Sequence, residues 1–104
     1  MKIIKCIAEK IQEEVKDANA YIDLAMEWKS EEPEAADMFY QLSTEEIGHA
    51  DKLHGVVVSL IKKYREKNGE PPAGMLAIYN YLHEQQIENA MRIKVKQKMY
   101  EEAA

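Results

Sequence analysis

The sequence predicts an all-α protein, in which a long antiparallel helical hairpin is followed by a third, C-terminal helix. Only four Gly and three Pro occur among 104 residues, which leaves too few turns for a β-sandwich or a barrel. Breaks near 30–33 and 68–74 leave three uninterrupted stretches, roughly 3–29, 33–67 and 73–101. At 1.5 Å per residue these helices are about 40, 50 and 45 Å long. Because such helices cannot bury their apolar faces in so small a chain, we expect an elongated hairpin that completes its core by oligomerising.

Both breaks carry signals for the ends of helices. Ser30 or Glu32 can cap the second helix, and Pro33 has its φ angle preset for a first helical turn. Gly69 suits the position just after the end of that helix, and the adjacent prolines at 71–72 prevent its continuation. The third helix therefore begins after these prolines.

The composition excludes several classes of protein. Nineteen acidic against fourteen basic residues disfavour binding to a phosphate backbone, so we expect no nucleic-acid partner. No run approaches the roughly 18 apolar residues of a membrane span, and 1–8 is too short for a signal peptide. A single cysteine, Cys6, excludes an intrachain disulfide and suits a reducing compartment. We expect one cytoplasmic domain spanning 1–104.

The first two helices carry apolar seams at alternating spacings of three and four. The first seam is Ile4, Ile7, Ile11, Glu14, Ala18, Tyr21, Ala25 and Trp28. The second seam is Phe39, Leu42, Glu46, His49, Leu53, Val56 and Leu60. Seams of this period are buried against partner helices, where an uncompensated carboxylate is costly. The exceptions Glu14, Glu46 and His49 therefore need an explanation.

The third helix has a less regular pattern. Its best seam is Ala77, Tyr81, Glu84, Glu88, Met91 and Val95. We interpret Glu84 and Glu88 as a solvated acidic face or an access route for a cation. We expect His54 on the flank of the second helix and His83 at an interface.

Folding the hairpin about its turn brings the three polar exceptions together. The turn centre lies between Glu31 and Glu32, so residues whose numbers sum to about 63, such as Glu14 and His49, come level. Glu46 precedes His49 by one turn on the same face. Two carboxylates and an imidazole are a ligand set for a divalent metal, and Glu-x-x-His places both donors toward one ion. A Glu-x-x-His pair alone often occurs by chance, but the joint pattern predicts a metal site.

These residues resemble the motifs of the ferritin-like diiron carboxylate proteins, which include ferritins, rubrerythrins and encapsulated ferritins. Their first helix carries a Glu followed seven residues later by a Tyr, here Glu14 and Tyr21. Their second helix carries Glu-Glu-x-x-His-Ala, here 45–50. The resemblance covers roughly 3–67. It implies Glu14, Glu46 and His49 as iron ligands, with Glu46 bridging, and Tyr21 as a hydrogen-bond partner of a ligand on another helix.

The chain departs from the family in its third helix. Full-length members supply a second Glu and a second Glu-x-x-His from two further helices, whereas 88–91 here reads Glu-Asn-Ala-Met. The resemblance therefore implies a ferritin-like four-helix bundle completed by dimerisation, in which a second, two-fold-related copy completes the site, as in the short encapsulated ferritins. We expect a homodimer at minimum, or a larger ring. The resemblance also implies a shell protein as a partner, which would enclose the assembly in a protein nanocompartment.

The function implied by the resemblance is that of a ferroxidase, which oxidises Fe2+ to Fe3+ at a diiron site for iron storage or detoxification. Zn, Mn or Ca could occupy the same ligands. Two alternatives remain open from the residues. One is a non-catalytic helical assembly module with a structural metal such as zinc. The other is a helical hairpin that docks a partner without metal, in which the acids set register.

Overall fold

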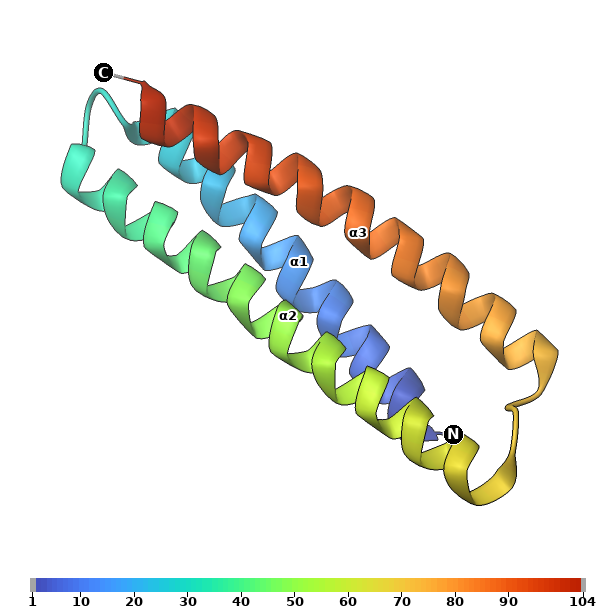
Figure 1. Ribbon diagram of the computed structural model, residues 1–104. Coiled ribbons are helices and arrows are strands. Elements are labelled where there is room, and N and C mark those ends of the chain that lie inside the picture. The colour runs from blue at the N-terminus through green and yellow to red at the C-terminus, as the bar shows by residue number, and fades with distance from the viewer. Residues whose placement is uncertain (1, 104) are drawn as a thin grey trace.

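The computed structural model describes residues 2–103 and contains three α-helices. They are α1 (Lys2–Trp28), α2 (Pro33–Asn68) and α3 (Ala73–Glu102). Figure 1 shows α1 and α2 as an antiparallel hairpin, with α3 returning along it so that the C-terminus lies near the turn between α1 and α2. Each helix begins and ends within one residue of its predicted bounds, which confirms the all-α prediction.

The bundle is elongated. Its principal extents are 56 × 18 × 17 Å and its radius of gyration is 16.6 Å, whereas a compact chain of about 100 residues has a radius near 13 Å. Within residues 2–103, none of the helices combines the length and the apolar composition that crossing a bilayer requires. The long, thin shape leaves a large share of each helix outside the core of a single chain.

The ends of α2 follow the sequence signals in part. The helix begins at Pro33, and the residue before it, Glu32, makes no side-chain capping bond. Gly69 follows its last residue with φ +79°, and its backbone N–H donates to the Arg65 carbonyl at 3.0 Å. That positive φ strains residues other than glycine, so Gly69 ends the helix as predicted.

Small residues form much of the contact between α1 and α2. The buried row of α1 is Ile4, Ala8, Ile11, Val15, Ala18, Ile22 and Ala25. The buried residues of α2 are Ala36, Ser43, Ile47, Ala50 and Val57. In both rows Ala or Ser is interspersed with Ile and Val, whereas Leu and aromatic side chains such as Leu42 and Phe39 lie at the flanks of the contact.

The predicted seams of α1 and α2 are therefore wrong in part. In α1, Ile7, Glu14 and Tyr21 lie half-buried at the edge of the core, and Trp28 is exposed. In α2 the predicted seam lies beside the buried row, displaced by one residue at several positions. Its half-buried members are Phe39, Leu42, Glu46, Leu53 and Leu60, and its exposed members are His49 and Val56.

The predicted seam of α3 is wrong, because it faces outward. All six of its members, Ala77, Tyr81, Glu84, Glu88, Met91 and Val95, are exposed. The inward row has the same period: Leu76, Tyr79, His83, Gln86, Ala90, Ile93, Gln97 and Tyr100. The polar side chains Gln86 and Gln97 in this row form hydrogen bonds with the α1–α2 hairpin. Gln86 Nε2 donates to the Ala8 carbonyl at 3.2 Å, and Gln97 Nε2 donates to Ser43 Oγ at 2.9 Å.

The C-terminal half of α3 is clamped to the α1–α2 turn. Lys29 Nζ donates to the backbone carbonyls of Tyr100 and Ala103, the latter at 2.7 Å. The Tyr100 ring stacks on Tyr40 with centroids 5.0 Å apart, and its hydroxyl donates to Asp37. Burial, and then the hydrogen bond to Asp37, raises the pKa of Tyr100 to about 12. The phenol therefore stays a donor throughout the neutral range.

A buried relay involving Ser43 gives the first testable prediction. The Ser43 hydroxyl donates to the Ala18 carbonyl at 2.7 Å and accepts from Gln97, so it joins all three helices. Ser43→Ala leaves the buried Gln97 amide without this acceptor, and we expect a loss of about 1–3 kcal/mol in the free energy of unfolding. Urea denaturation measures it. The control is Thr44→Ala, whose exposed hydroxyl bonds only within its own helix, to Gln41. Equal losses in both variants would contradict the prediction.

Candidate metal centre

The hairpin brings Glu14, Glu46 and His49 together at one height, as the sequence predicts. His49 Nδ1 lies 3.6 Å from Glu14 Oε2 across the two helices and 3.9 Å from Glu46 Oε1 on its own helix. One ligand atom from each residue lies within 4.8 Å of the others. The i,i+3 spacing on α2 sets the second contact, and the antiparallel register of α1 and α2 sets the first.

The spacing of these atoms is close to what a metal needs. Ligand atoms at about 2.1 Å from an ion lie about 3.0–3.4 Å from one another in octahedral or tetrahedral geometry. The two distances from His49 Nδ1, 3.6 and 3.9 Å, exceed this range slightly. Small side-chain rotations would therefore bring all three donors onto one ion, and the residues present fit a divalent metal.

The cluster is open on one side. The side chains of Glu14 and Glu46 are 13 % and 19 % exposed, whereas that of His49 is 55 % exposed. The cluster therefore lies at the edge of the core of a single chain and not in its interior. Because the edge of the α1–α2 contact carries the cluster, solvent, an ion or a second chain can reach it directly.

Lys10 lies beside the cluster and was not identified from the sequence pattern. Its Nζ is 3.7 Å from Glu14 Oε1 and 3.3 Å from Glu13 Oε2. The hydrogen bond to Glu13, followed by the charges of Glu13 and Glu14, raises the pKa of Lys10. The i,i+4 spacing from Lys10 to Glu14 is the signal that could have revealed it. A metal ion on Glu14 would displace this ammonium, because both compete for the same carboxylate.

Tyr21 lies apart from the cluster. Its ring stacks on Phe39 with centroids 6.4 Å apart and an interplanar angle of 18°. The residue is two helical turns from Glu14, and the antiparallel register sets Phe39, not Glu46, opposite it. The hydrogen bond from Tyr21 to a ligand on another helix therefore stays a prediction.

The acids of α3 also lie outside the cluster. Glu84 and Glu88 are exposed and belong to the row of α3 that faces away from the hairpin. They do not belong to the group formed by Glu14, Glu46 and His49. This position agrees with the prediction of a solvated acidic face rather than a ligand pair.

Comparison with known proteins adds no relative. No family model, curated protein or solved structure matches the chain. The interpretation of the cluster therefore rests on the residue types, their spacing and the distances between their ligand atoms.

Proposed function

We propose that the protein is a ferritin-like ferroxidase, which binds Fe2+ through Glu14, Glu46 and His49 and oxidises it at a diiron site shared by two chains. The observation that carries the proposal is the convergence of two carboxylates and one imidazole within 4.8 Å. One chain supplies half of the four-carboxylate, two-imidazole set that ferritin-like diiron sites use. A two-fold axis beside His49 would supply the other half.

The uncovered face of the hairpin supports a second copy at this position. On α1, half-buried residues follow one another every seven positions at the edge of the core: Ile7, Glu14 and Tyr21. On α2 the matching row is Leu42, His49 and Val56. Helix α3 packs against other positions, such as Asn19 of α1 and His54 of α2. The face that carries the cluster is therefore not covered by α3, and an identical face can pack on it by two-fold symmetry.

The residues of the cluster suit iron oxidation. Glu14 and Glu46 supply negative charge, which stabilises Fe3+ more than Fe2+ and lowers the reduction potential. Neutral His49 adds a nitrogen donor. The iron supplies the redox chemistry, since each Fe2+ gives one electron to dioxygen or peroxide. The ammonium of Lys10 pairs with the Glu14 carboxylate. A metal cation that binds Glu14 would displace this ammonium.

The test is to load the protein anaerobically with Fe2+, to measure its mass in solution and its iron content, and then to add oxidant. We expect about one iron per chain in a dimer and a saturable rise in Fe3+ absorbance. A dimer that retains zinc but shows no redox turnover would favour the structural-metal assembly module. A protein that retains no metal would favour the docking hairpin.

Tyr21→Phe gives a second prediction. We propose that the hydroxyl of Tyr21 tunes a ligand on the partner chain without holding the metal, so the variant should retain most of its iron. The oxidation rate should fall by about 10-fold, within the range that partners of metal ligands contribute. Iron content and stopped-flow absorbance measure the two quantities separately. Complete loss of iron in Tyr21→Phe would contradict this role.

A further inference from the structure

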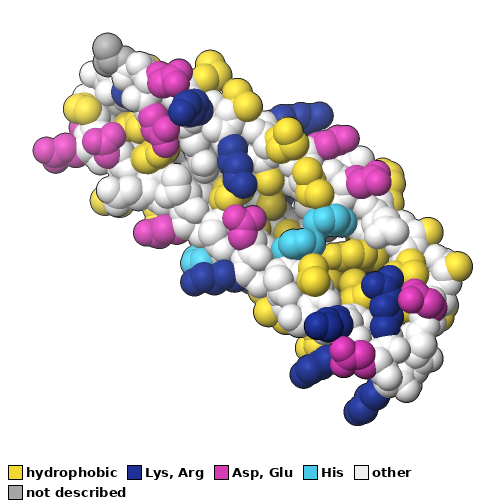
Figure 2. Space-filling model, viewed as in Figure 1, with side chains coloured by type: hydrophobic (Ala, Val, Ile, Leu, Met, Phe, Trp, Pro, Cys, Tyr) yellow, Lys and Arg dark blue, Asp and Glu magenta, His cyan; other side chains and the backbone are white. Residues whose placement is uncertain are grey.

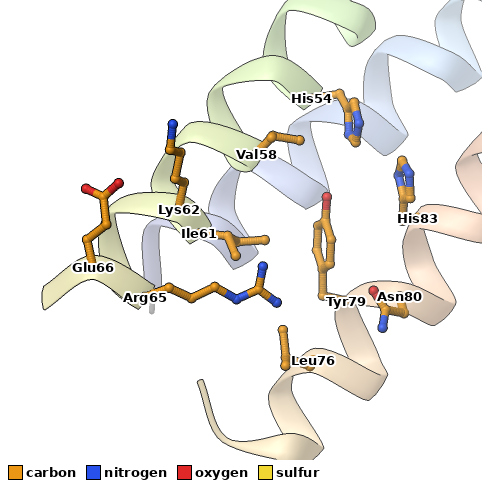
Figure 3. Close-up of a pocket in the computed structure, with 10 residues that line it drawn as sticks. All are labelled: His54, Val58, Ile61, Lys62, Arg65, Glu66, Leu76, Tyr79, Asn80 and His83. Carbon is orange, nitrogen blue, oxygen red and sulfur yellow. The ribbon is translucent and has the colours of Figure 1, made fainter. Parts of the chain in front are cut away.

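A stack of three rings joins α2 to the first half of α3, away from the candidate metal centre. The His54 ring of α2 lies on the His83 ring of α3 with centroids 4.3 Å apart and an interplanar angle of 5°. Tyr79, one turn earlier in α3, continues the stack at 5.7 Å from His83 and also at 5°. Figure 3 shows His54 approaching from α2 while Tyr79 and His83 project from α3.

The rest of this junction is loosely packed. A cavity of about 460 Å³ separates α2 from α3 next to the stack, and Val58, Ile61 and Leu76 form its apolar lining. Most of the side-chain hydrogen bonds between α3 and the hairpin lie in the other half of α3. Lys96 bonds Asn19 and Asp23 of α1, for example, at 2.9 and 2.8 Å. The stacked rings are therefore a principal contact of the first half of α3 with α2.

The histidines face few groups that could compensate a positive charge. The charged or titratable neighbours from α2 are Asp51, Lys62, Arg65 and Glu66, and those from α3 are Tyr79 and Glu84. Helix α1 contributes only apolar Ile11 and Val15 to the adjoining hollow. In Figure 3 Arg65 extends toward the cavity, while Lys62 and Glu66 point away from it. In the view of Figure 2 two histidines lie side by side, with Lys and Arg gathered toward the α2–α3 connection.

The electrostatics of His83 favour its neutral form. Burial lowers the pKa of His83, the charge of His54 lowers it further, and Glu84 raises it. Neutral imidazoles stack well, whereas two imidazolium rings at 4.3 Å would repel each other across a partly desolvated gap. The observed stack therefore belongs to the neutral pair.

We propose that His54 and His83 form an acid-sensitive latch, which holds the first half of α3 on α2 while His83 is neutral and releases it when His83 is protonated. Release would leave the second half of α3 clamped through Gln97 and Tyr100. It would expose the apolar lining of the cavity on both helices. The latch is independent of the proposed ferroxidase function, because it involves neither the metal cluster nor the uncovered face of the hairpin.

The direction of the pH effect follows from the lowered pKa of His83. The open state, in which His83 has the ordinary pKa of 6.5, binds more protons than the closed state. Stability of the closed state is therefore complete above about pH 6.5 and is lost as the pH falls below it. For one proton taken up on opening, the opening equilibrium rises roughly tenfold for each pH unit below 6.5.

The geometry argues against a shared metal at this pair. In two parallel stacked rings the nitrogen lone pairs lie in separate planes, so they do not point to one ion. Among residues 2–103, the three-residue group with converging ligand atoms is the one of Glu14, Glu46 and His49. The proposal therefore concerns the charge of the two rings and not ligation.

Hydrogen exchange tests the latch in the full chain. Protection of amides 76–86 and 90–100 is measured at about pH 7.5 and 5.5, each relative to the unstructured rate at the same pH. We expect protection of 76–86 to fall roughly tenfold at the lower pH while 90–100 is unaffected. His83→Phe keeps a ring in the stack but takes up no proton, so the fall should disappear. Equal protection of wild type at both pH values, or the same fall in His83→Phe, would overturn the proposal.

A second measurement keeps the test decisive if His83→Phe does not fold. NMR titration of the wild-type imidazoles should show the two rings titrating as a coupled pair, with His83 gaining its proton below pH 6.5. Glu84→Gln removes the carboxylate that raises the pKa of His83 in the closed state, so the difference from the open state widens and opening should move to higher pH. Independent titration of both rings at their ordinary pKa would overturn the latch.

Discussion

Glu46→Ala is expected to abolish the saturable oxidation of Fe2+ and to weaken metal binding by at least about 100-fold. Glu46 is the proposed bridging ligand, so its loss would remove one oxygen donor from each of two ions, and two-fold symmetry would double the defect. Isothermal titration with Fe2+ under anaerobic conditions measures the affinity, and dioxygen consumption measures the activity. The matched control is Glu45→Ala, which removes an exposed acid from the adjacent position of the same helix. Equal loss in both variants would contradict the assignment.

Replacing Glu14, Glu46 and His49 together with Leu separates metal binding from folding. Binding should be abolished, whereas the free energy of unfolding should equal or exceed that of the metal-free wild type, because the charged cluster is replaced by apolar side chains. Bound metal should stabilise the wild type by about 2.7 kcal/mol at a free concentration 100 times Kd. Thermal denaturation with and without chelator measures both effects. Unchanged metal content in the triple variant would exclude these residues as ligands.

Val56→Lys is expected to convert a dimer into monomers and to remove most of the bound iron with it. Val56 is 48 % exposed in a single chain and lies two turns beyond His49 in the uncovered row of α2. The monomer tolerates a lysine at this exposed position. In the dimer the same lysine would be buried against the partner chain. Light scattering at micromolar concentration should fall from twice the 12.0 kDa chain mass to the mass of one chain.

The matched control for this prediction is Met91→Lys. Met91 is apolar and 62 % exposed, but it lies on the outward row of α3, so the same charge there should leave the dimer and its iron intact. A wild-type mass of one chain with metal bound would contradict the shared site. Dissociation by Met91→Lys instead of Val56→Lys would place the interface on α3.

The helix bounds could be predicted because local signals determine them. Pro33 begins α2 because its ring presets the φ angle of a first helical turn. Gly69 ends α2 because it adopts a φ angle of +79°. Neither depends on which residues pack across the helix. The position of Glu14 opposite His49, at the same height along the hairpin, could also be predicted. A short turn and a rise of 1.5 Å per residue set the register of an antiparallel hairpin.

The buried rows could be predicted only in part, because burial depends on which faces come together: Ile4, Ile11, Ala18 and Ala25 of the predicted α1 seam are buried. The pattern of large apolar residues favoured Leu42 and Val56, but the hairpin closes on Ser43 and Val57 at the neighbouring positions. In α3 the same pattern favoured Met91 and did not include Gln97. Gln97 is buried because Ser43, 54 residues away in sequence, accepts its hydrogen bond.

Local backbone chemistry and helix geometry are enough to predict three helices, their ends, the hairpin register and the meeting of Glu14, Glu46 and His49. The packing of the helices places this cluster at the open edge of the core, with His49 55 % exposed, and not in its interior. The same packing stacks the His54 ring on the His83 ring. The physical reason is the same for both: the side of each helix that is buried depends on the close approach of small residues and on long-range hydrogen bonds.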